Sequence, residues 1–306
     1  MLGLLVARWV NIYSSSLLLS LFAFRRLYLI PVSDREHRHR PDQRWIVALR
    51  WICWCAMSIS GIIWFWAVVS ALMDSGIEWG PAQEVIGGTQ FGHLWLLRSL
   101  LGLVIAGGLL RYTPKKESRP HSDLPWIALA AINLASLAWA GHAGAAGGRA
   151  ANFHVFIDLM HLLASALWPS GLLPLTVWFV INTKERGSEL LDYAVLHRFS
   201  ATSLGAVALL ATTGLLNSLF MVKRFSDLNA TNYGQVLAAK IVLFCIMIGL
   251  GAENRRLLKV RRLRGTQTAA DRGGVARLFR NICAESALAF VVFGLVGALG
   301  AIAPPV

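Results

Sequence analysis

Apolar stretches of about 20 residues recur along the whole chain and limit its possible folds more than any other feature. An α-helix of that length spans the hydrocarbon core of a bilayer, where only helices and closed barrels satisfy every backbone hydrogen bond. About eight such stretches are predicted to cross the membrane, at roughly 3–30, 45–73, 91–112, 125–143, 153–181, 197–222, 235–256 and 278–303. The sequence therefore predicts an all-α, polytopic transmembrane helical bundle, with residues 1–306 forming a single integral membrane domain.

The composition supports a membrane protein and argues against a nucleic-acid-binding one. Apolar residues make up 56% of the 306 residues and charged residues 15%, whereas a soluble domain carries about 25% charged residues. The net charge of +13 comes mostly from Lys and Arg in short segments between the predicted spans, which is the pattern of cytoplasmic loops. We therefore expect the lipid bilayer as the surroundings of the chain, and no nucleic-acid partner.

The segments between the predicted spans alternate between basic and nearly neutral, and this alternation sets the expected orientation. If the N-terminus is outside, most of the 29 Lys and Arg residues fall in or beside the inner segments, and the densest run lies at 255–280. Positive charge accumulates in cytoplasmic loops, so we expect an N-out, C-out topology.

Potential metal ligands gather where the predicted fourth and fifth spans meet. His142 ends the fourth span, and His154, Asp158 and His161 follow in the fifth. Because successive residues of an α-helix turn by about 100°, residues 154, 158 and 161 share one face over two turns. In the N-out orientation this cluster lies toward the outer side, as does the weaker candidate His93. Ionisable groups inside a span are costly and usually serve an ion or proton path.

The residue types in this cluster suit a transition metal. Imidazole binds copper, zinc, iron and nickel, and a carboxylate adds a ligand or orients a histidine. His154 and His161 are two turns apart, so the cluster forms either one full site or a relay of two partial sites. Asp158 would act as a ligand, as an orienting group or as a charge compensator. The alternative is a polar cluster that only holds helices together.

Two further polar features lie deeper in the predicted bundle. Pro169 removes a backbone hydrogen bond and is predicted to kink the fifth span. Glu285 is predicted to form a structural ion pair with Arg280 or Arg50, and a role in a proton or ion path is the second interpretation.

Several spaced motifs then point to a known family. They are Trp139-Ala-Gly-His142-Ala, His154-x-x-x-Asp158-x-x-His161, Ala166-Leu-Trp168-Pro-Ser-Gly171-Leu, His197-Arg-Phe199-Ser200, Thr213-Gly214, Asn232-Tyr233-Gly234, Lys240, Glu253-Asn254-Arg255 and Glu285. In these motifs the chain resembles the CopD/PcoD copper-resistance membrane proteins, which include YebZ-like proteins and the membrane part of YcnJ-like proteins. The resemblance makes 139–303 the CopD-like part. The sequence departs from it at Trp168-Pro169-Ser170-Gly171, where the resemblance leads us to expect Trp-x-Gly-Gly.

The resemblance implies copper handling at the bacterial inner membrane, with copper uptake from the periplasm toward the cytoplasm. It also implies a separate periplasmic CopC-like copper carrier as partner. Under this interpretation His142, His154 and His161 capture copper, Asp158 assists, and His93 is a weaker metal candidate. We favour a transporter over an enzyme.

Two other classes of function remain open from the sequence. One is a haem b- or quinol-linked membrane oxidoreductase, for instance a copper reductase, because histidines from facing spans supply axial haem ligands. The other is a structural or sensing subunit in which the polar cluster only sets helix packing.

Overall fold

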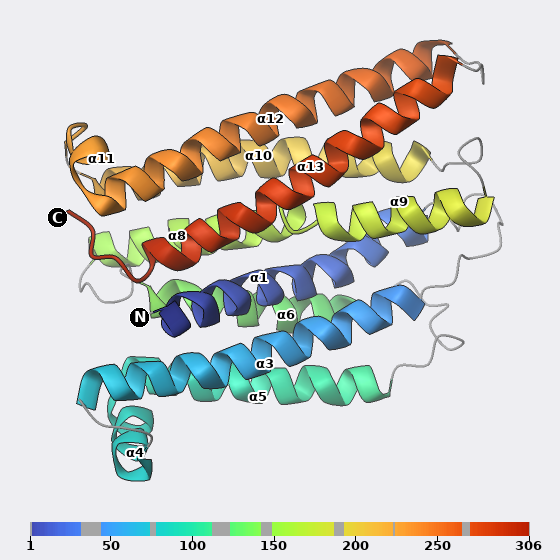
Figure 1. The fold of residues 1–306 in the computed structure, drawn as a ribbon. Helices are drawn as coiled ribbons and strands as arrows, with labels where there is room; N and C mark the ends of the chain where they lie inside the picture. The colour runs from blue at the N-terminus through green and yellow to red at the C-terminus, as the bar shows by residue number, and fades with distance from the viewer. Residues whose placement is uncertain are drawn as a thin grey trace.

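The computed structural model describes residues 2–31, 44–73, 78–111, 123–141, 149–186, 193–222, 224–264 and 270–305, and every regular element within these ranges is helical (Figure 1). The all-α prediction is therefore confirmed. The elements, in chain order, are α1 (Leu2–Phe24), the π-helical turn η1 (Arg25–Leu29), α3 (Arg44–Met73), α4 (Trp79–Gly88), α5 (Gln90–Leu110), α6 (Leu124–Ala135), the 3-10 helix η2 (Ser136–Ala140), α8 (Arg149–Leu167), α9 (Leu172–Arg186), α10 (Tyr193–Met221), α11 (Asp227–Ala230), α12 (Asn232–Arg264) and α13 (Ala270–Leu299).

Seven helical segments of the described chain are long and apolar enough to cross a membrane. They correspond to seven of the predicted spans, and the polytopic helical bundle is thus confirmed. The remaining predicted span, the fourth, is the shorter apolar helix Leu124–Ala140, formed by α6 and η2. The short helix α4 was not anticipated, because its 10 residues lie below the length at which an apolar run indicates a span.

The bundle has two distinct ends. Both termini lie at the same end as α4 and α11, on the left of Figure 1. The helix ends that flank the basic segments of the sequence, such as the end of α12 and the start of α13, lie at the opposite end. The described helices therefore separate the termini from the basic segments, as the N-out, C-out prediction requires, and the side that faces the cytoplasm stays a prediction.

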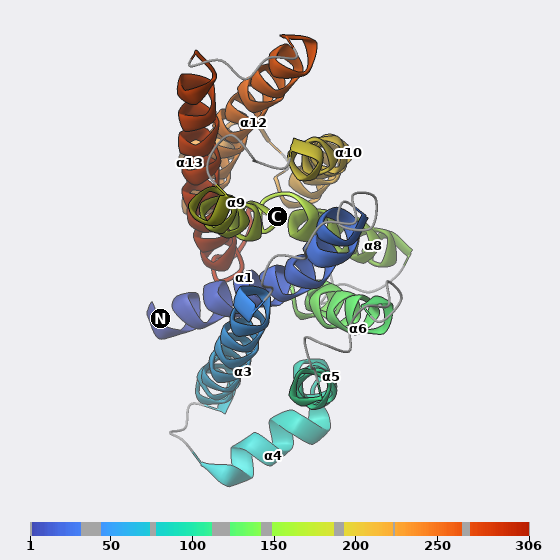
Figure 2. The ribbon, with the colours of Figure 1, turned by 90° about the vertical axis from the view of Figure 1, so that its right-hand side faces the viewer.

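Helix α1 lies at the centre of the arrangement. It packs against α3, α6, α8, α9 and α13, and Figure 2 shows it between the helices of the N-terminal half and those of the C-terminal half. The side chains of Ser14, Ser15, Ser16 and Ser20 are buried on α1. Small residues let helix backbones approach closely in a membrane, and their hydroxyl groups hydrogen-bond across helices. The serines thus explain how one helix contacts so many neighbours.

The predicted interruption at Pro169 is confirmed. Helix α8 ends at Leu167 and α9 begins at Leu172, with a tight turn between them inside one apolar crossing. The Ser170 hydroxyl lies 2.7 Å from the hydroxyl of Ser16 on α1, which anchors the turn to the centre of the bundle. A Cβ at Gly171 would lie 2.8 Å from the carbonyl oxygen of Leu167, so the turn requires glycine at this position.

Candidate metal-binding site

The first half of α8 packs against α10, and the side chains of His154, Asp158 and His161 point into this contact. His154 is buried, and its imidazole ring stacks on the ring of Phe220 with 4.6 Å between centroids and 11° between planes. One turn further along α8, the Asp158 carboxylate accepts a hydrogen bond of 3.3 Å from the Asn217 side-chain amide.

His161 has the most informative geometry of the three predicted residues. Its Nδ1 atom lies 2.9 Å from the Thr213 hydroxyl oxygen. The same hydroxyl lies 2.5 Å from the carbonyl oxygen of Leu209. A carbonyl oxygen can only accept a hydrogen bond, so the hydroxyl donates its single proton to Leu209. Nδ1 of His161 must therefore carry a proton and donate it to Thr213. In this tautomer the other ring nitrogen, Nε2, is unprotonated and keeps the lone pair that a metal requires.

These contacts form a regular series across two antiparallel helices. Residues 154, 158 and 161 advance along α8 by four and three, while their partners 220, 217 and 213 recede along α10 by three and four. We call this series the α8–α10 ladder, and its members are His154, Asp158, His161, Thr213, Asn217 and Phe220. The sequence analysis did not assign the α10 members to the site, although Thr213-Gly214 was among the family motifs. A second signal was the pair Thr213 and Asn217, two polar residues one turn apart in an apolar helix.

A glycine on α10 leaves room for the His161 ring. A Cβ at Gly214 would lie 3.4 Å from Cε1 and 3.9 Å from Nδ1 of His161, in direct van der Waals contact with the ring. Gly205, nearer to the start of the same helix, has no atom within 4 Å of such a Cβ. Any side chain at position 214 would therefore contact the His161 ring.

A cation from a third helix joins the ladder. The charge of Lys240 on α12 interacts with the Asp158 carboxylate and lies near His161. Tyr233, also on α12, is buried and lies within the electrostatic range of Asp158. The negative charge of Asp158 thus has a partner before any metal arrives. A metal cation that approaches Asp158 would compete with Lys240 for it.

The structure brings three of the five predicted site residues together. His142 lies outside the described residues, so its position relative to the ladder stays a prediction. His93 is exposed on α5, which packs against α3, α4, α6 and η2, and the structure does not bring it onto the ladder. Among the described residues, no three His, Cys, Asp or Glu side chains come close enough to hold one ion. Within the described chain the ladder therefore resembles a series of partial sites more than one closed site.

The prediction for Glu285 is wrong in its partners. Within the part of the chain that the structure describes, neither Arg280 nor Arg50 forms an ion pair with it. Glu285 instead accepts hydrogen bonds from the side chains of Asn254 and Trp168.

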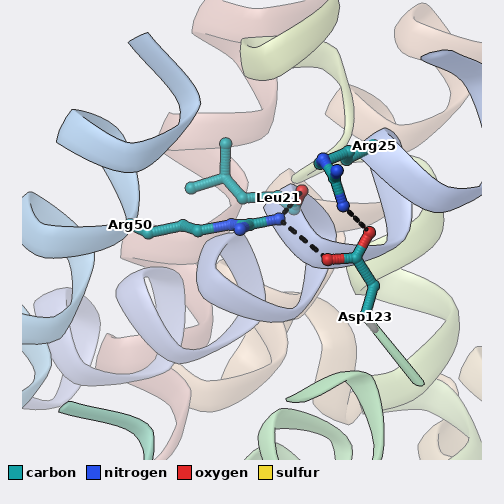
Figure 3. Close-up of polar contacts among 4 residues, drawn as sticks. All are labelled: Leu21, Arg25, Arg50 and Asp123. Carbon is teal, nitrogen blue, oxygen red and sulfur yellow. Dashed lines mark hydrogen bonds and ion pairs between the residues drawn. The ribbon is translucent and has the colours of Figure 1, made fainter. Parts of the chain in front are cut away.

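Arg50 lies in a separate buried cluster at the end of the bundle opposite to the ladder. Figure 3 shows Arg25 and Arg50 on either side of the Asp123 carboxylate. Arg25 hydrogen-bonds Asp123, and Arg50 lies 3.8 Å from it and 3.4 Å from the Leu21 carbonyl oxygen. The Arg50 guanidinium also stacks over the Phe22 ring, 4.0 Å from its centroid. This cluster ties α1, α3 and α6 together, which gives it a structural role.

The fold and the ladder together define a class: a multi-pass helical membrane protein with histidine and aspartate side chains on one internal helix face. Comparison with known proteins narrows the class. Two protein families match the chain. The family of the N-terminal domain of copper resistance protein D-like proteins matches residues 1–153, and the Copper resistance protein D family matches residues 193–299. The chain belongs to this copper-resistance family, and it is thus a copper-handling membrane protein.

Three relatives illustrate the relationship. Copper resistance protein D of Pseudomonas syringae pv. tomato is 29% identical over 251 residues, which cover 78% of this chain and 77% of the relative. Inner membrane protein YebZ of Escherichia coli (strain K12) is 29% identical over 222 residues, covering 71% and 72%. Copper transport protein CutJ of Bacillus subtilis (strain 168) is 28% identical over 200 residues, which cover 63% of this chain and 36% of CutJ. No solved structure matches the chain.

Proposed function

We propose that this protein moves copper from the periplasm toward the cytoplasm through the bacterial inner membrane, and that the α8–α10 ladder is the outer part of the path. The observation that carries the proposal is the tautomer of His161. Thr213 holds Nδ1 as the donor, which leaves Nε2 as a ligand atom on the helix face that also carries Asp158 and His154. Hydrogen bonds of this kind orient ligating histidines and raise their basicity.

The spacing of the ladder suits a cargo ion better than a resident one. Closed sites with three or four protein ligands bind transition metals tightly, and tight binding opposes release. Single imidazoles two turns apart, about 10 Å along the helix axis, would instead pass copper from one to the next. His142 would add a first ligand at the outer mouth. Because only neutral imidazole binds a metal, protonation of the histidines at acid pH should weaken capture.

Two expectations complete this proposal. The chain is oriented N-out, C-out, which places the start of α8 on the periplasmic side. Copper then arrives from a separate CopC-like periplasmic carrier. A cysteine introduced at 144–152 should react with an impermeant thiol reagent in intact spheroplasts, and one introduced at 257–277 should not. The reverse labelling would place the ladder on the cytoplasmic side.

Copper uptake by proteoliposomes that contain the purified full chain tests the function. The wild type and His37→Ala, a control outside the ladder, should accumulate copper, whereas the double variant His154→Ala/His161→Ala should not. Equal uptake by all three folded proteins would remove the ladder from the mechanism. The optical spectrum of the same preparation separates the rival class, because a Soret band would indicate haem b ligation and an oxidoreductase.

A further inference from the structure

Glu285 is a buried carboxyl group that the copper path along α8 and α10 does not use. It lies on α13 with 1% of its surface exposed. Its hydrogen-bond donors are the Asn254 side-chain amide of α12 and the Trp168 indole at the end of α8. A Cβ at Gly251, one turn before Asn254, would lie 3.5 Å from Glu285 Oε2, so α12 packs closely against the carboxyl group.

The basic residues closest in sequence to this carboxyl group are engaged elsewhere or face outward. On α12, Arg256 lies 3.8 Å from Glu253, and Arg255 is directed at the carbonyl oxygen of Ser200. On α13, Arg277 lies 3.9 Å from Glu253, and Arg280 is exposed.

Among the described side chains of the other helices that pack on α13, none forms an ion pair with Glu285. The α9 contact is the hydroxyl pair Thr176 and Ser286, 2.8 Å apart. On α1, Tyr13 packs on Phe290 and Phe293, and Arg8 lies beside Gly300, just beyond the end of α13 and far along the chain from Glu285. Within the described chain, Glu285 therefore has neutral donors and no ion-pair partner.

A carboxylate in this environment would be expensive. Burial of an ionised group in an apolar medium costs several kcal/mol unless an opposite charge compensates it, and a group without such a partner usually becomes neutral. Protonation removes the charge and turns one carboxyl oxygen into a donor.

An acceptor for that donor stands beside the carboxyl group. Asn254 Oδ1 is buried and has no hydrogen-bond partner among the described residues, although Nδ2 of the same amide donates to Glu285. A side-chain amide and a carboxylic acid are complementary, because an N–H of the amide can donate to the acid's C=O while the acid's O–H donates to the amide oxygen. A carboxylate offers only acceptors and would leave Oδ1 unsatisfied.

We propose that Glu285 and Asn254 form a proton-binding site inside the membrane, with the carboxyl group of Glu285 protonated in the conformation described here. On release the O–H bond breaks, the proton passes to water, and the carboxylate keeps the electron pair. Trp168 connects this site to α8, seven residues beyond His161 and about 10 Å further along the helix axis. The proposal does not depend on copper binding by the ladder.

Infrared spectroscopy of the full chain in lipid vesicles tests the site at neutral pH. The wild type should show the carbonyl stretch of a protonated carboxyl group, shifted to lower frequency in D₂O. Glu285→Gln should lack that band, while Glu253→Gln, which alters a carboxylate already paired with arginines, should retain it. Asn254→Ala should shift the band because the carbonyl loses its donor. Identical spectra for the wild type and a folded Glu285→Gln would overturn the proposal.

Two further measurements keep the test decisive. A protonated carboxyl group in a membrane reacts with a hydrophobic carbodiimide, so mass spectrometry of the wild type should find the adduct on Glu285, with less labelling as the pH rises. Absence of the adduct at neutral pH would contradict protonation without any variant.

Glu285→Gln should also keep the thermal midpoint of the wild type, because one neutral side chain replaces another of the same shape. A large loss of stability would mean that the native group is charged.

Discussion

Replacement of Thr213 by valine should weaken copper binding without removing any ligand. The valine keeps the shape of the side chain but loses the hydroxyl that accepts the proton from Nδ1 of His161, 2.9 Å away. The imidazole then loses the partner that fixes its tautomer and its rotation. A population with the proton on Nε2 cannot bind metal through that atom, and the remaining population is no longer held in place.

The magnitude follows from the position of the hydroxyl behind the ligand. Loss of a hydrogen bond that orients a ligating histidine typically costs about 10- to 100-fold in affinity, which is about 1.4 to 2.8 kcal/mol. The stability of the fold should fall by about 1–3 kcal/mol, because the hydroxyl loses its hydrogen bonds to both His161 and Leu209 while the volume is preserved. Copper affinity is therefore compared between variants that have been shown to be folded.

The adjacent residue supplies a matched control. Thr212 makes the same kind of hydrogen bond to its own helix, 2.9 Å to the Ala208 carbonyl oxygen, but it is exposed and does not touch His161. Equilibrium copper titration of purified Thr213→Val, Thr212→Val and the wild type should give a lower affinity for the first variant alone. Equal affinities for Thr213→Val and the wild type would show that His161 either does not bind copper or does not need Thr213 to do so.

Two further substitutions probe the site and the fold. Gly214→Ala should lower copper affinity because its Cβ would contact the His161 ring and restrict it, whereas Gly205→Ala should leave affinity unchanged. The same titration measures both variants, and equal losses would refute a role for this contact. Asp123→Asn should destabilise the protein by about 3–5 kcal/mol, because it removes a buried carboxylate that pairs with two buried arginines. Glu253→Gln is the control: it breaks more exposed ion pairs and should cost at most about 1 kcal/mol. Denaturant unfolding in detergent measures both variants, and equal losses of stability would show that burial of the Asp123 pairs does not matter.

The features that the sequence predicted depend on residues close together in the chain. The length of an apolar run decides whether a helix crosses the membrane, and the spacing of His154, Asp158 and His161 decides that they share a face. The break near Pro169 follows from its missing amide hydrogen. Each of these is a property of one helix, and each was read without knowledge of its neighbours.

The features that the sequence did not predict depend on how separate helices meet. Asn217 faces Asp158 only because α8 and α10 pack antiparallel in one register, and the sequence of two residues 59 positions apart does not reveal that register. The partner of Glu285 was misjudged for the same reason. Arg50 was a candidate by charge, but in the folded chain it lies beside Asp123. Charge complementarity in a sequence names possible pairs, and helix packing chooses among them.

The role of Asp158 can be decided by removing its counter-charge. Asp158→Asn takes away a possible ligand and also leaves the Lys240 cation beside His161, where it repels copper. If Asp158 is a ligand, the additional change Lys240→Met should not restore binding. If Asp158 acts by charge compensation, the double variant should recover much of the lost affinity, because the imidazoles then bind copper in a neutral environment.

The structure favours charge compensation, since Asp158 already interacts with Asn217 and Lys240, and no group of three potential ligands closes around one ion among the described residues. We therefore expect a coupling free energy between the two substitutions of about 0.5–3 kcal/mol, in the direction of recovery. Copper titration of the two single variants and the double variant measures it. Additive losses would make Asp158 a direct ligand and would turn the ladder from a relay of single imidazoles into a relay of mixed sites.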